Sequence, residues 1–202
     1  HGVWRDFSLG GLGAFRKGSG ISRSEVGTGP LPCIRYGEIY TSYNAYTFET
    51  ITRVSSDIAA KATKIARGDI VFACTGETKE DIGKCVAYMS NQVGYAGGDT
   101  QILTPKAGID PVFLSLLLNS NEVQRQKSAR GQGDAVVHIS GDSLMAVQLR
   151  LPPYDEQQAI SRVAMDLDNE IAATERKLEK YGQIRQGMMR ELLTGHIRLV
   201  QE

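Results

Sequence analysis

The feature that most constrains this chain is a long amphipathic segment near its end. Between Asp155 and Gly195, residues of the apolar stripe recur at alternating spacings of four and three. The seam consists of Ile160, Ala164, Leu167, Ile171, Thr174, Leu178, Tyr181, Arg185, Met188 and Leu192, with Thr174 and Arg185 as its imperfections. This heptad pattern predicts one helix of roughly 40 residues, about 60 Å long. A stripe of that length exceeds what a small domain can cover, so we expect a partner helix; an ordinary surface helix is the alternative.

The two ends of this segment carry helix-terminus signals. Asp155 is expected to cap the helix, with Gln158 three residues later as in a capping box. Gly195 occupies the position that glycine favours just after a helix. Gly182 and Gly187 should each weaken the helix by about 1 kcal/mol relative to alanine.

The composition changes at Leu151-Pro152-Pro153, which marks a domain boundary. Before it the chain is rich in glycine and short apolar runs; after it helix formers dominate. We therefore predict an α+β fold: a β-rich domain over residues 1–153 with an inserted helix, followed by one long coiled-coil helix over residues 154–202.

Short apolar runs bounded by turn residues predict the strands of the first domain. They are residues 69–74, 84–89, 100–104 and 135–139, and an alternation at Val147, Leu149 and Leu151. The inserted helix is predicted over Pro111–Ala129, because Asp110 is a suitable cap and a proline follows it. Its expected apolar face is Phe113, Leu116, Leu117 and Val123.

Composition places the chain among globular proteins but does not point to nucleic acid. Of the 202 residues 41% are hydrophobic and 23% charged, and no apolar run approaches membrane-spanning length. The 23 basic residues equal the 23 acidic ones. Residues 1–150 hold 16 Lys and Arg against 14 Asp and Glu, and the remainder holds 7 against 9. Such a balance is awkward for a protein that must neutralise phosphates.

Cysteine usage predicts a reduced, cytoplasmic protein without a metal site. Cys33, Cys74 and Cys85 are odd in number and form no C-x-x-C pair, whereas a zinc site needs about four close ligands. The first residues, His1-Gly2, show no basic and apolar leader. We expect no metal, no cofactor and no membrane span.

Two segments resemble catalytic motifs but lack the chemistry. Leu151-Pro-Pro-Tyr154 is similar to the motif of adenine methyltransferases, yet Leu151 has no oxygen to accept a hydrogen bond from a flipped base. The glycines of Gly10–Gly13 neither follow a convincing strand nor open a helix. A Cys74–His138 pair, and the carboxylates of Asp69, Glu77, Glu80 and Asp81, are weaker candidates still. We predict no catalytic residue in this chain.

Residue types suited to DNA contact gather in three stretches. They combine hydroxyls, amides, aromatic rings and cations, which can bind phosphates and base edges. The candidates are Tyr43, Asn44, Tyr46, Arg53, Thr75, Thr78, Lys79, Arg125, Lys127, Arg130 and Gln132. Taken singly, each is also an ordinary solvated surface residue.

The order of several short motifs resembles the specificity subunits of type I restriction–modification systems. The matches are Trp4…Leu9-Gly10, Ala66-Arg-Gly-Asp69-Ile-Val, Cys74-Thr-Gly76, Asp110-Pro-Val-Phe-Leu114 to Ser120, Gly131…Ile139-Ser140 with Leu144, Leu149-Arg-Leu-Pro-Pro-Tyr-Asp-Glu-Gln157-Gln-Ala-Ile160, and Leu192-Leu-Thr-Gly195. They cover roughly residues 4–195 in the family's order and spacing.

The resemblance implies a non-catalytic recognition domain that reads one half of a bipartite double-stranded DNA site. It also implies separate modification (methyltransferase) subunits, a restriction subunit, and paired helices that set the distance between two recognition domains. Members of the family usually contain two such repeats, whereas this sequence shows one. The resemblance therefore implies a homodimer, a pairing with a second half-subunit, or a fragment. It assigns no base-reading residues.

Two other interpretations remain open from the sequence. The chain is also compatible with a recognition module cut from a fused restriction–methyltransferase enzyme. It is further compatible with a coiled-coil scaffold that does not bind DNA.

Overall fold

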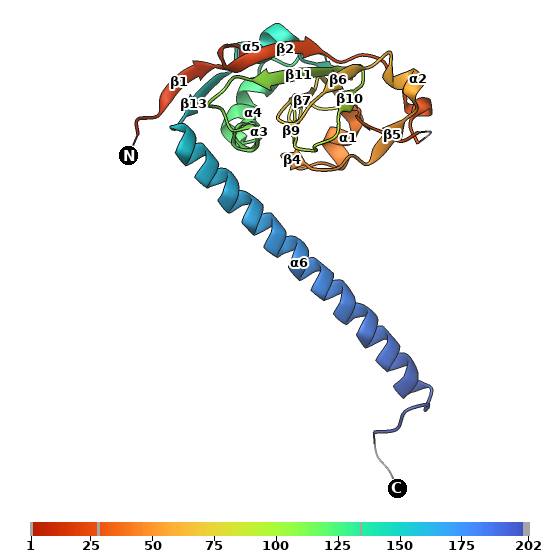
Figure 1. Cartoon of the computed structure of the whole chain (residues 1–202). Coiled ribbons are helices and arrows are strands. Elements are labelled where there is room, and N and C mark those ends of the chain that lie inside the picture. The colour runs from red at the N-terminus through yellow and green to blue at the C-terminus, as the bar shows by residue number, and fades with distance from the viewer. Residues whose placement is uncertain (1, 28, 134, 200–202) are drawn as a thin grey trace. The chain divides into compact units, whose positions relative to one another are not determined.

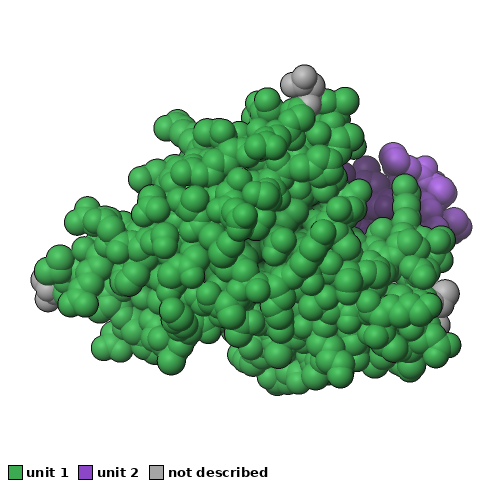
Figure 2. All heavy atoms as spheres, turned by 90° about the horizontal axis from the view of Figure 1, so that it is seen from above, with its two compact units in different colours: residues 1–158 green, residues 159–202 purple. Residues whose placement is uncertain are grey.

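A computed structural model describes residues 2–27, 29–133 and 135–199. The chain divides into two compact units, residues 1–158 and residues 159–202, which are coloured separately in Figure 2. Within the described ranges, no helix combines the length and apolar character needed to cross a membrane.

A five-stranded sheet forms the centre of residues 1–158 (Figure 1). Its order is β2 (Gly13–Lys17), β11 (Thr100–Pro105), β7 (Ile70–Ala73), β9 (Cys85–Tyr88) and β4 (Tyr46–Thr47). The neighbours are antiparallel except β9 and β4, which are parallel.

A second, four-stranded sheet is built largely from the segment between β2 and β7. Its order is β5 (Thr52–Val54), β3 (Leu31–Ile34), β10 (Gly94–Ala96) and β6 (Thr63–Ile65), with β3 and β10 parallel. Three short helical segments accompany it: η2 (Arg23–Glu25), α1 (Tyr36–Thr41) and α2 (Ser56–Ala59).

Two strand pairs complete the domain. β1 (Arg5–Ser8) pairs with β13 (Gln148–Leu151), and β8 (Thr75–Gly76) pairs with β12 (Val137–His138). A 3-10 helix η1 (Leu9–Leu12) follows β1, and α5 (Gly141–Met145) precedes β13. All five strands expected from the sequence are thus present, with small shifts at their ends.

The five-stranded sheet is covered by apolar side chains on both faces. On one face Val71, Val86 and Ile102 share a core cluster with residues of the four-stranded sheet and α1, among them Ile34 and Ile39. On the other face the sheet packs in a second cluster that contains residues of η1, α3 and α4. A third cluster fills the outer side of the four-stranded sheet. The α+β prediction is therefore confirmed, with two stacked sheets as its main feature.

The predicted inserted helix is two helices. α3 spans Pro111–Leu118 and α4 spans Asn121–Ser128. Asp110 caps α3 as expected, since its carboxylate accepts from the Phe113 amide at 2.8 Å. The break is held by Asn119, whose side chain accepts from the Cys85 amide at 3.1 Å and donates to the Cys85 carbonyl at 2.8 Å. Ser120 then caps α4.

The long helix predicted from the heptad pattern is α6, Tyr154–Leu193, 40 residues in one piece. It begins one residue before the expected cap, so Asp155 lies in the first turn instead. Gln157 stabilises this turn through its buried side-chain amide. The amide oxygen accepts from the Asp110 backbone N–H at 3.0 Å, and the amide nitrogen donates to the Pro152 carbonyl at 2.9 Å. Gly195 follows the helix with φ 76°, as predicted.

Asp69 fixes the turn that leads into β7. Its buried carboxylate accepts hydrogen bonds from the Ala66 amide at 2.9 Å and the Thr104 hydroxyl at 2.6 Å, and it pairs with Arg16 at 2.6 Å. The acidic residue of the Ala66–Asp69 motif is therefore a structural group rather than part of a carboxylate cluster.

Lys127 is fully buried, although the sequence placed it among the DNA contacts. Its ammonium donates to the Gly83 carbonyl at 2.8 Å. Desolvation in this environment lowers the pKa of Lys127 to about 8. The side chain is therefore absent from the surface that a ligand could reach.

We expect Lys127 to make stability depend on alkaline pH. Between pH 8 and the usual lysine value of 10.5 the unfolded chain holds the Lys127 proton more strongly than the folded one, so the contribution of Lys127 to stability should rise with pH, by up to about 3 kcal/mol. The buried thiols of Cys33, Cys74 and Cys85 act in the opposite direction above about pH 9, because burial raises their pKa values. Urea unfolding of the wild type and Lys127→Met over this range isolates the lysine contribution as the difference between the two free energies of unfolding. The wild type should gain stability relative to Lys127→Met as the pH rises, whereas its difference from Lys79→Met, which removes an exposed cation, should stay constant. Equal slopes for wild type and Lys127→Met would contradict the assignment.

Candidate nucleic-acid interface

Several chain segments that differ widely in sequence position meet at one end of the five-stranded sheet. β7 and β2 end there, while β11 and β9 begin there, as their registers require. We call this the distal end. It is marked by Lys17, Thr100, Ala73 and Cys85. β4 begins nearer the opposite end, because Tyr46 pairs with Ala87, which in turn pairs with Ile70 at the start of β7. The first turn of α6 contacts Asp110, beyond the opposite end of β11.

Predicted DNA contacts from the second sequence stretch lie directly at the distal end, whereas Asn44, from the first stretch, is exposed and precedes β4. Thr75 follows β7, and Thr78 and Lys79 are exposed in the loop between β8 and β9. Gln132, from the third stretch, joins them through the pairing described next.

Three polar side chains form a row across neighbouring backbone segments. Thr75 of β8 is the register partner of His138 of β12, and His138 in turn forms a bridge with Gln132. The Thr75 hydroxyl lies 3.0 Å from His138 Nδ1. His138 and Gln132 are exposed and Thr75 is half-buried, whereas Val137 on the opposite side of β12 is in the core. We call Thr75, His138 and Gln132 the polar row.

His138 was considered in the sequence only as a partner for Cys74, not as a DNA contact. The strand pattern already contained the signal, because buried Val137 and Ile139 flank it and an alternating strand must turn residue 138 outward. Its Nδ1 contacts Thr75. Cys74 is buried, and burial raises the pKa of its thiol to about 12, so no nucleophilic thiolate is available at neutral pH.

Helix α4 holds the base of the 77–84 loop through its side chains. Gln124 donates to the Ile82 carbonyl at 2.8 Å, and Lys127 donates to the adjacent Gly83 carbonyl. Arg125 is exposed on this helix, while Arg130 bonds back to the Gln126 carbonyl at 2.8 Å. Lys127 thus positions the loop that carries Lys79, a role that its sequence neighbourhood did not indicate.

The segment around Asn44 is fixed by buried groups. Tyr43 is in the core, and its hydroxyl oxygen accepts from the Ile51 amide at 2.9 Å. Burial raises the pKa of Tyr43 to about 12. Because its ring and hydroxyl are both engaged inside the domain, we leave Tyr43, like Lys127, out of the candidate surface.

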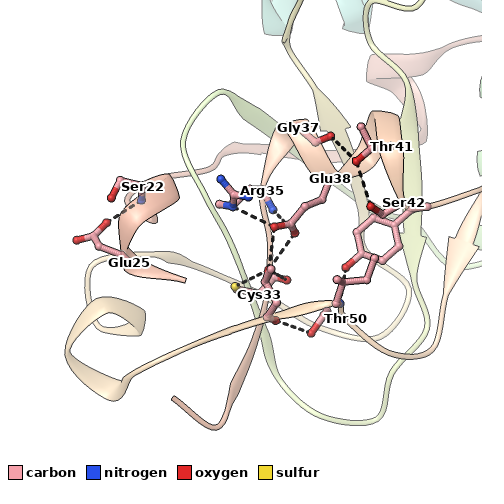
Figure 3. Close-up of polar contacts among 12 residues, drawn as sticks. Ser22, Glu25, Cys33, Arg35, Gly37, Glu38, Thr41, Ser42 and Thr50 are labelled. Atoms are coloured by element: carbon pink, nitrogen blue, oxygen red, sulfur yellow. Dashed lines mark hydrogen bonds and ion pairs between the residues drawn. The ribbon is translucent and has the colours of Figure 1, made fainter. Parts of the chain in front are cut away.

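Glu38 anchors the helix that precedes Asn44. Figure 3 shows Arg35 and Glu38 directed toward one another, with a bond of 3.0 Å between Nε and Oε1. The Thr52 hydroxyl lies 3.0 Å from both carboxylate oxygens of Glu38. These contacts join α1 to β5 and leave Glu38 buried and satisfied. Sequence reasoning did not single out this glutamate, because its partner in β5 is fourteen residues away.

Tyr46 and Arg53 do not belong to the polar row. Tyr46 is half-buried in β4 and meets the ring of Phe48 edge-on, with centroids 6.0 Å apart. Arg53 is exposed, but it belongs to the four-stranded sheet and donates to the Pro30 carbonyl at 2.7 Å. The structure does not bring Arg53 into the polar row.

Basic residues are distributed unevenly despite the net charge of zero. Residues 16–67 contain eight Lys and Arg against four Asp and Glu, one of which is the buried Glu38. Residues 68–150 contain seven against nine. Seven of the cations in the first segment are exposed: Arg16, which pairs with Asp69, and Lys17, Arg23, Arg53, Lys61, Lys64 and Arg67. The segment that builds most of the four-stranded sheet therefore supplies a basic surface suited to phosphates.

The two motifs that resembled catalytic sites have packing roles. A Cβ at Gly13 would lie 2.2 Å from the Thr104 carbonyl oxygen, so β2 can approach β11 there only with glycine. Leu151 is buried at the end of β13. In the described ranges, no group of three or more His, Cys, Asp or Glu side chains is arranged to hold a metal ion.

The heptad seam of α6 presents large apolar side chains to solvent. Leu167, Leu178, Tyr181 and Met188 are each about 60–70% exposed, and Ile160 and Ile171 are also exposed. Ala164 and Leu192 are half-buried. Such a continuous apolar stripe is typical of a helix that pairs with another.

Comparisons with known proteins agree with this architecture. The family model for the type I restriction modification DNA specificity domain matches residues 2–180. A relative, the putative type I restriction enzyme MjaX specificity subunit of Methanocaldococcus jannaschii, is 29% identical over 134 residues, which cover 63% of this chain and 30% of the relative.

Solved structures show the same fold. The S subunit of a type I restriction–modification system from M. genitalium aligns with a TM-score of 0.62 at 14% identity, covering 95% of this chain and 46% of that one. The HsdS subunit from Thermoanaerobacter tengcongensis aligns with a TM-score of 0.59 at 18% identity, covering 93% and 44%. This sequence thus spans less than half the length of these relatives. The match of the family model to most of the sequence shows that the chain belongs to the type I restriction–modification DNA specificity family.

Proposed function

We propose that this chain binds double-stranded DNA and reads one half of a two-part recognition sequence. The observation that carries the proposal is the family match over residues 2–180, in a fold that gathers Thr75, Lys79 and Gln132 at one end of the sheet. The basic segment 16–67 adds cations for phosphate contacts. The family match disfavours a scaffold that does not bind DNA.

In this proposal the chain supplies recognition and other subunits supply chemistry. The modification subunits would methylate adenine, and a restriction subunit would cleave. We propose that residues 1–158 present the DNA surface, with Asn44, Tyr46, Arg53, Thr75, Thr78, Lys79, Arg125, Arg130 and Gln132 as candidate contacts. Such a protein acts on cellular DNA, in line with the cytoplasmic location expected from the sequence.

Contacts to DNA phosphates should make the binding affinity depend on salt concentration. Lys79→Ala should weaken binding to all duplexes and lower the slope of log affinity against log salt by about one. Lys106→Ala is the matched control, because Lys106 is exposed just after β11, at the end opposite the polar row. Fluorescence anisotropy at several salt concentrations measures both slopes. Equal slopes for Lys79→Ala and the wild type would remove this loop from the phosphate surface.

We further propose that α6 pairs with a second helix, either in another copy of this chain or in a second recognition half. Antiparallel pairing would place two recognition domains at opposite ends of a two-fold assembly. The proposal is supported by the apolar stripe of α6, because burying it would remove a large apolar area from water. The stripe consists of the exposed Ile160, Leu167, Ile171, Leu178, Tyr181 and Met188 and the half-buried Ala164 and Leu192.

Breaking the stripe should produce monomers. Leu167→Glu with Leu178→Glu places two charges in the proposed seam, and sedimentation at micromolar concentration should show loss of self-association. Asn169→Glu with Gln183→Glu is the matched control, since it adds the same charge at exposed positions off the seam. A wild type that is already monomeric would exclude the homodimer and leave pairing with a second recognition half.

The chain alone should transfer no methyl group to DNA. Leu151 offers no hydrogen-bond acceptor to a base amine, and Gly10–Gly13 serve packing. Radiolabelled S-adenosylmethionine with duplex DNA provides the assay, and the modification subunit of the same system is the positive control. If the purified chain alone incorporates label into DNA, the proposal that methyl transfer belongs to other subunits is refuted.

A further inference from the structure

We propose that the polar row is the base-reading element of the domain and that His138 is its central specificity-determining residue. This inference rests on the proposed function and goes beyond it, because it names the side chains that meet the base edges. The observation is the placement of Thr75, His138 and Gln132 side by side on three neighbouring backbone segments.

The dimensions of the row match those of a DNA groove. Neighbouring strands lie about 4.8 Å apart, so three adjacent segments extend the row over about 10 Å. Base pairs follow one another at about 3.4 Å, and the row therefore spans about three of them. The major groove admits a two-stranded ribbon of this kind, and β8 with β12 forms such a ribbon.

The chemistry of the three side chains complements base edges. The contact of 3.0 Å between the Thr75 hydroxyl and His138 Nδ1 occupies that nitrogen and leaves Nε2 for the DNA. The Gln132 amide carries both a donor and an acceptor, the pattern that pairs with N6 and N7 of adenine. Thr75 thus acts mainly by orienting the imidazole, and His138 and Gln132 make the reading contacts.

Buried side chains and backbone hydrogen bonds fix the backbone that carries the polar row. Val137 and Ile139, which flank His138, are buried, and the Gln132 and His138 backbones exchange hydrogen bonds of 2.9 and 2.8 Å. Gly131 permits this close packing, because a Cβ there would lie 2.9 Å from Val137 Cγ1. A fixed backbone under the exposed His138 and Gln132 and the half-buried Thr75 is the arrangement that specific recognition requires.

The charges beside the row favour a groove rather than the phosphate backbone. The neighbouring loop carries Glu77, Glu80 and Asp81 against one exposed cation, Lys79, since Lys84 is half-buried and donates to the Tyr40 carbonyl at 3.3 Å. Carboxylates repel phosphates but accept hydrogen bonds from the cytosine amino group, which is exposed in the major groove. The basic segment 16–67 carries a positive excess instead, which assigns phosphate contacts to that segment and to Lys79, and base contacts to the polar row.

Binding-site selection tests the proposal. The full chain, combined with the modification subunit of its own system, is used to select from a pool of duplexes with a randomised segment. Variants His138→Ala and Gln132→Ala should still bind DNA but lose the wild-type preference at one or two neighbouring base pairs, by about 5- to 150-fold. His196→Ala is the matched control, because His196 also has a hydroxyl at its Nδ1, that of Thr194 at 2.7 Å, but lies beyond α6.

A third variant separates positioning from general damage. Thr75→Val keeps the side-chain volume and removes the hydroxyl, so it should relax preference at the same base pair as His138→Ala. The double variant, Thr75→Val with His138→Ala, should then discriminate between base pairs as well as His138→Ala alone. Thermal unfolding midpoints of all variants should match the wild type within a few degrees, because His138 and Gln132 are exposed and valine fills the same volume as the half-buried Thr75.

The outcomes distinguish the inference about the polar row from the proposed function, DNA recognition by the chain. If the wild type selects a defined sequence and His138→Ala selects the same one with equal preference, the row is not the reader while the proposed function stands. If the wild type enriches no sequence, the proposed function is overturned and the row with it. If Thr75→Val and His138→Ala relax the sequence preference at two base pairs that are far from one another, Thr75 does not orient His138.

Discussion

The five-stranded sheet is buried on both faces, and this constraint determines where the domain can contact a ligand. All four residues of β7 and all four of β9 are buried. Because the central strands present no exposed face, polar side chains that meet DNA must come from strand ends and loops. The distal end concentrates them, since four strands begin or end there and bring Thr75 and the 77–84 loop together.

Buried polar groups turn this end into a rigid surface. Lys127 and Gln124 hold consecutive carbonyls of the 77–84 loop, and Glu38 joins α1 to β5. In the described ranges, every buried side-chain nitrogen and oxygen has a hydrogen-bond partner. A buried charge costs stability unless it is bonded in this way. Lys127 and Glu38 therefore fix backbone segments for recognition without touching the ligand themselves.

The sequence predicted what depends on local pattern and missed what depends on distant partners. Periodicity and capping chemistry, which act within a few residues, predicted five strands (β7, β9, β11, β12 and β13), the Asp110 cap and the 40-residue helix. The expectation that no convincing strand precedes Gly10–Gly13 was wrong, because β1 is exposed along its length and is held by its pairing with β13. The break between α3 and α4 was missed because Asn119 bonds to Cys85, thirty-four residues away. Lys127 and Tyr43 looked like surface residues for the same reason: their burial depends on segments far along the chain.

The sequence by itself determined the family, the α+β domain followed by a long helix, and the absence of a methyltransferase acceptor at Leu151, because motif order, hydrophobic period and residue chemistry are written along the chain. Only the tertiary structure decided which polar residues stand together. Thr75 and His138 are sixty-three positions apart, and no local pattern relates them. Strand pairing places them in one register, since cross-strand hydrogen bonds align residues by backbone geometry and not by sequence distance.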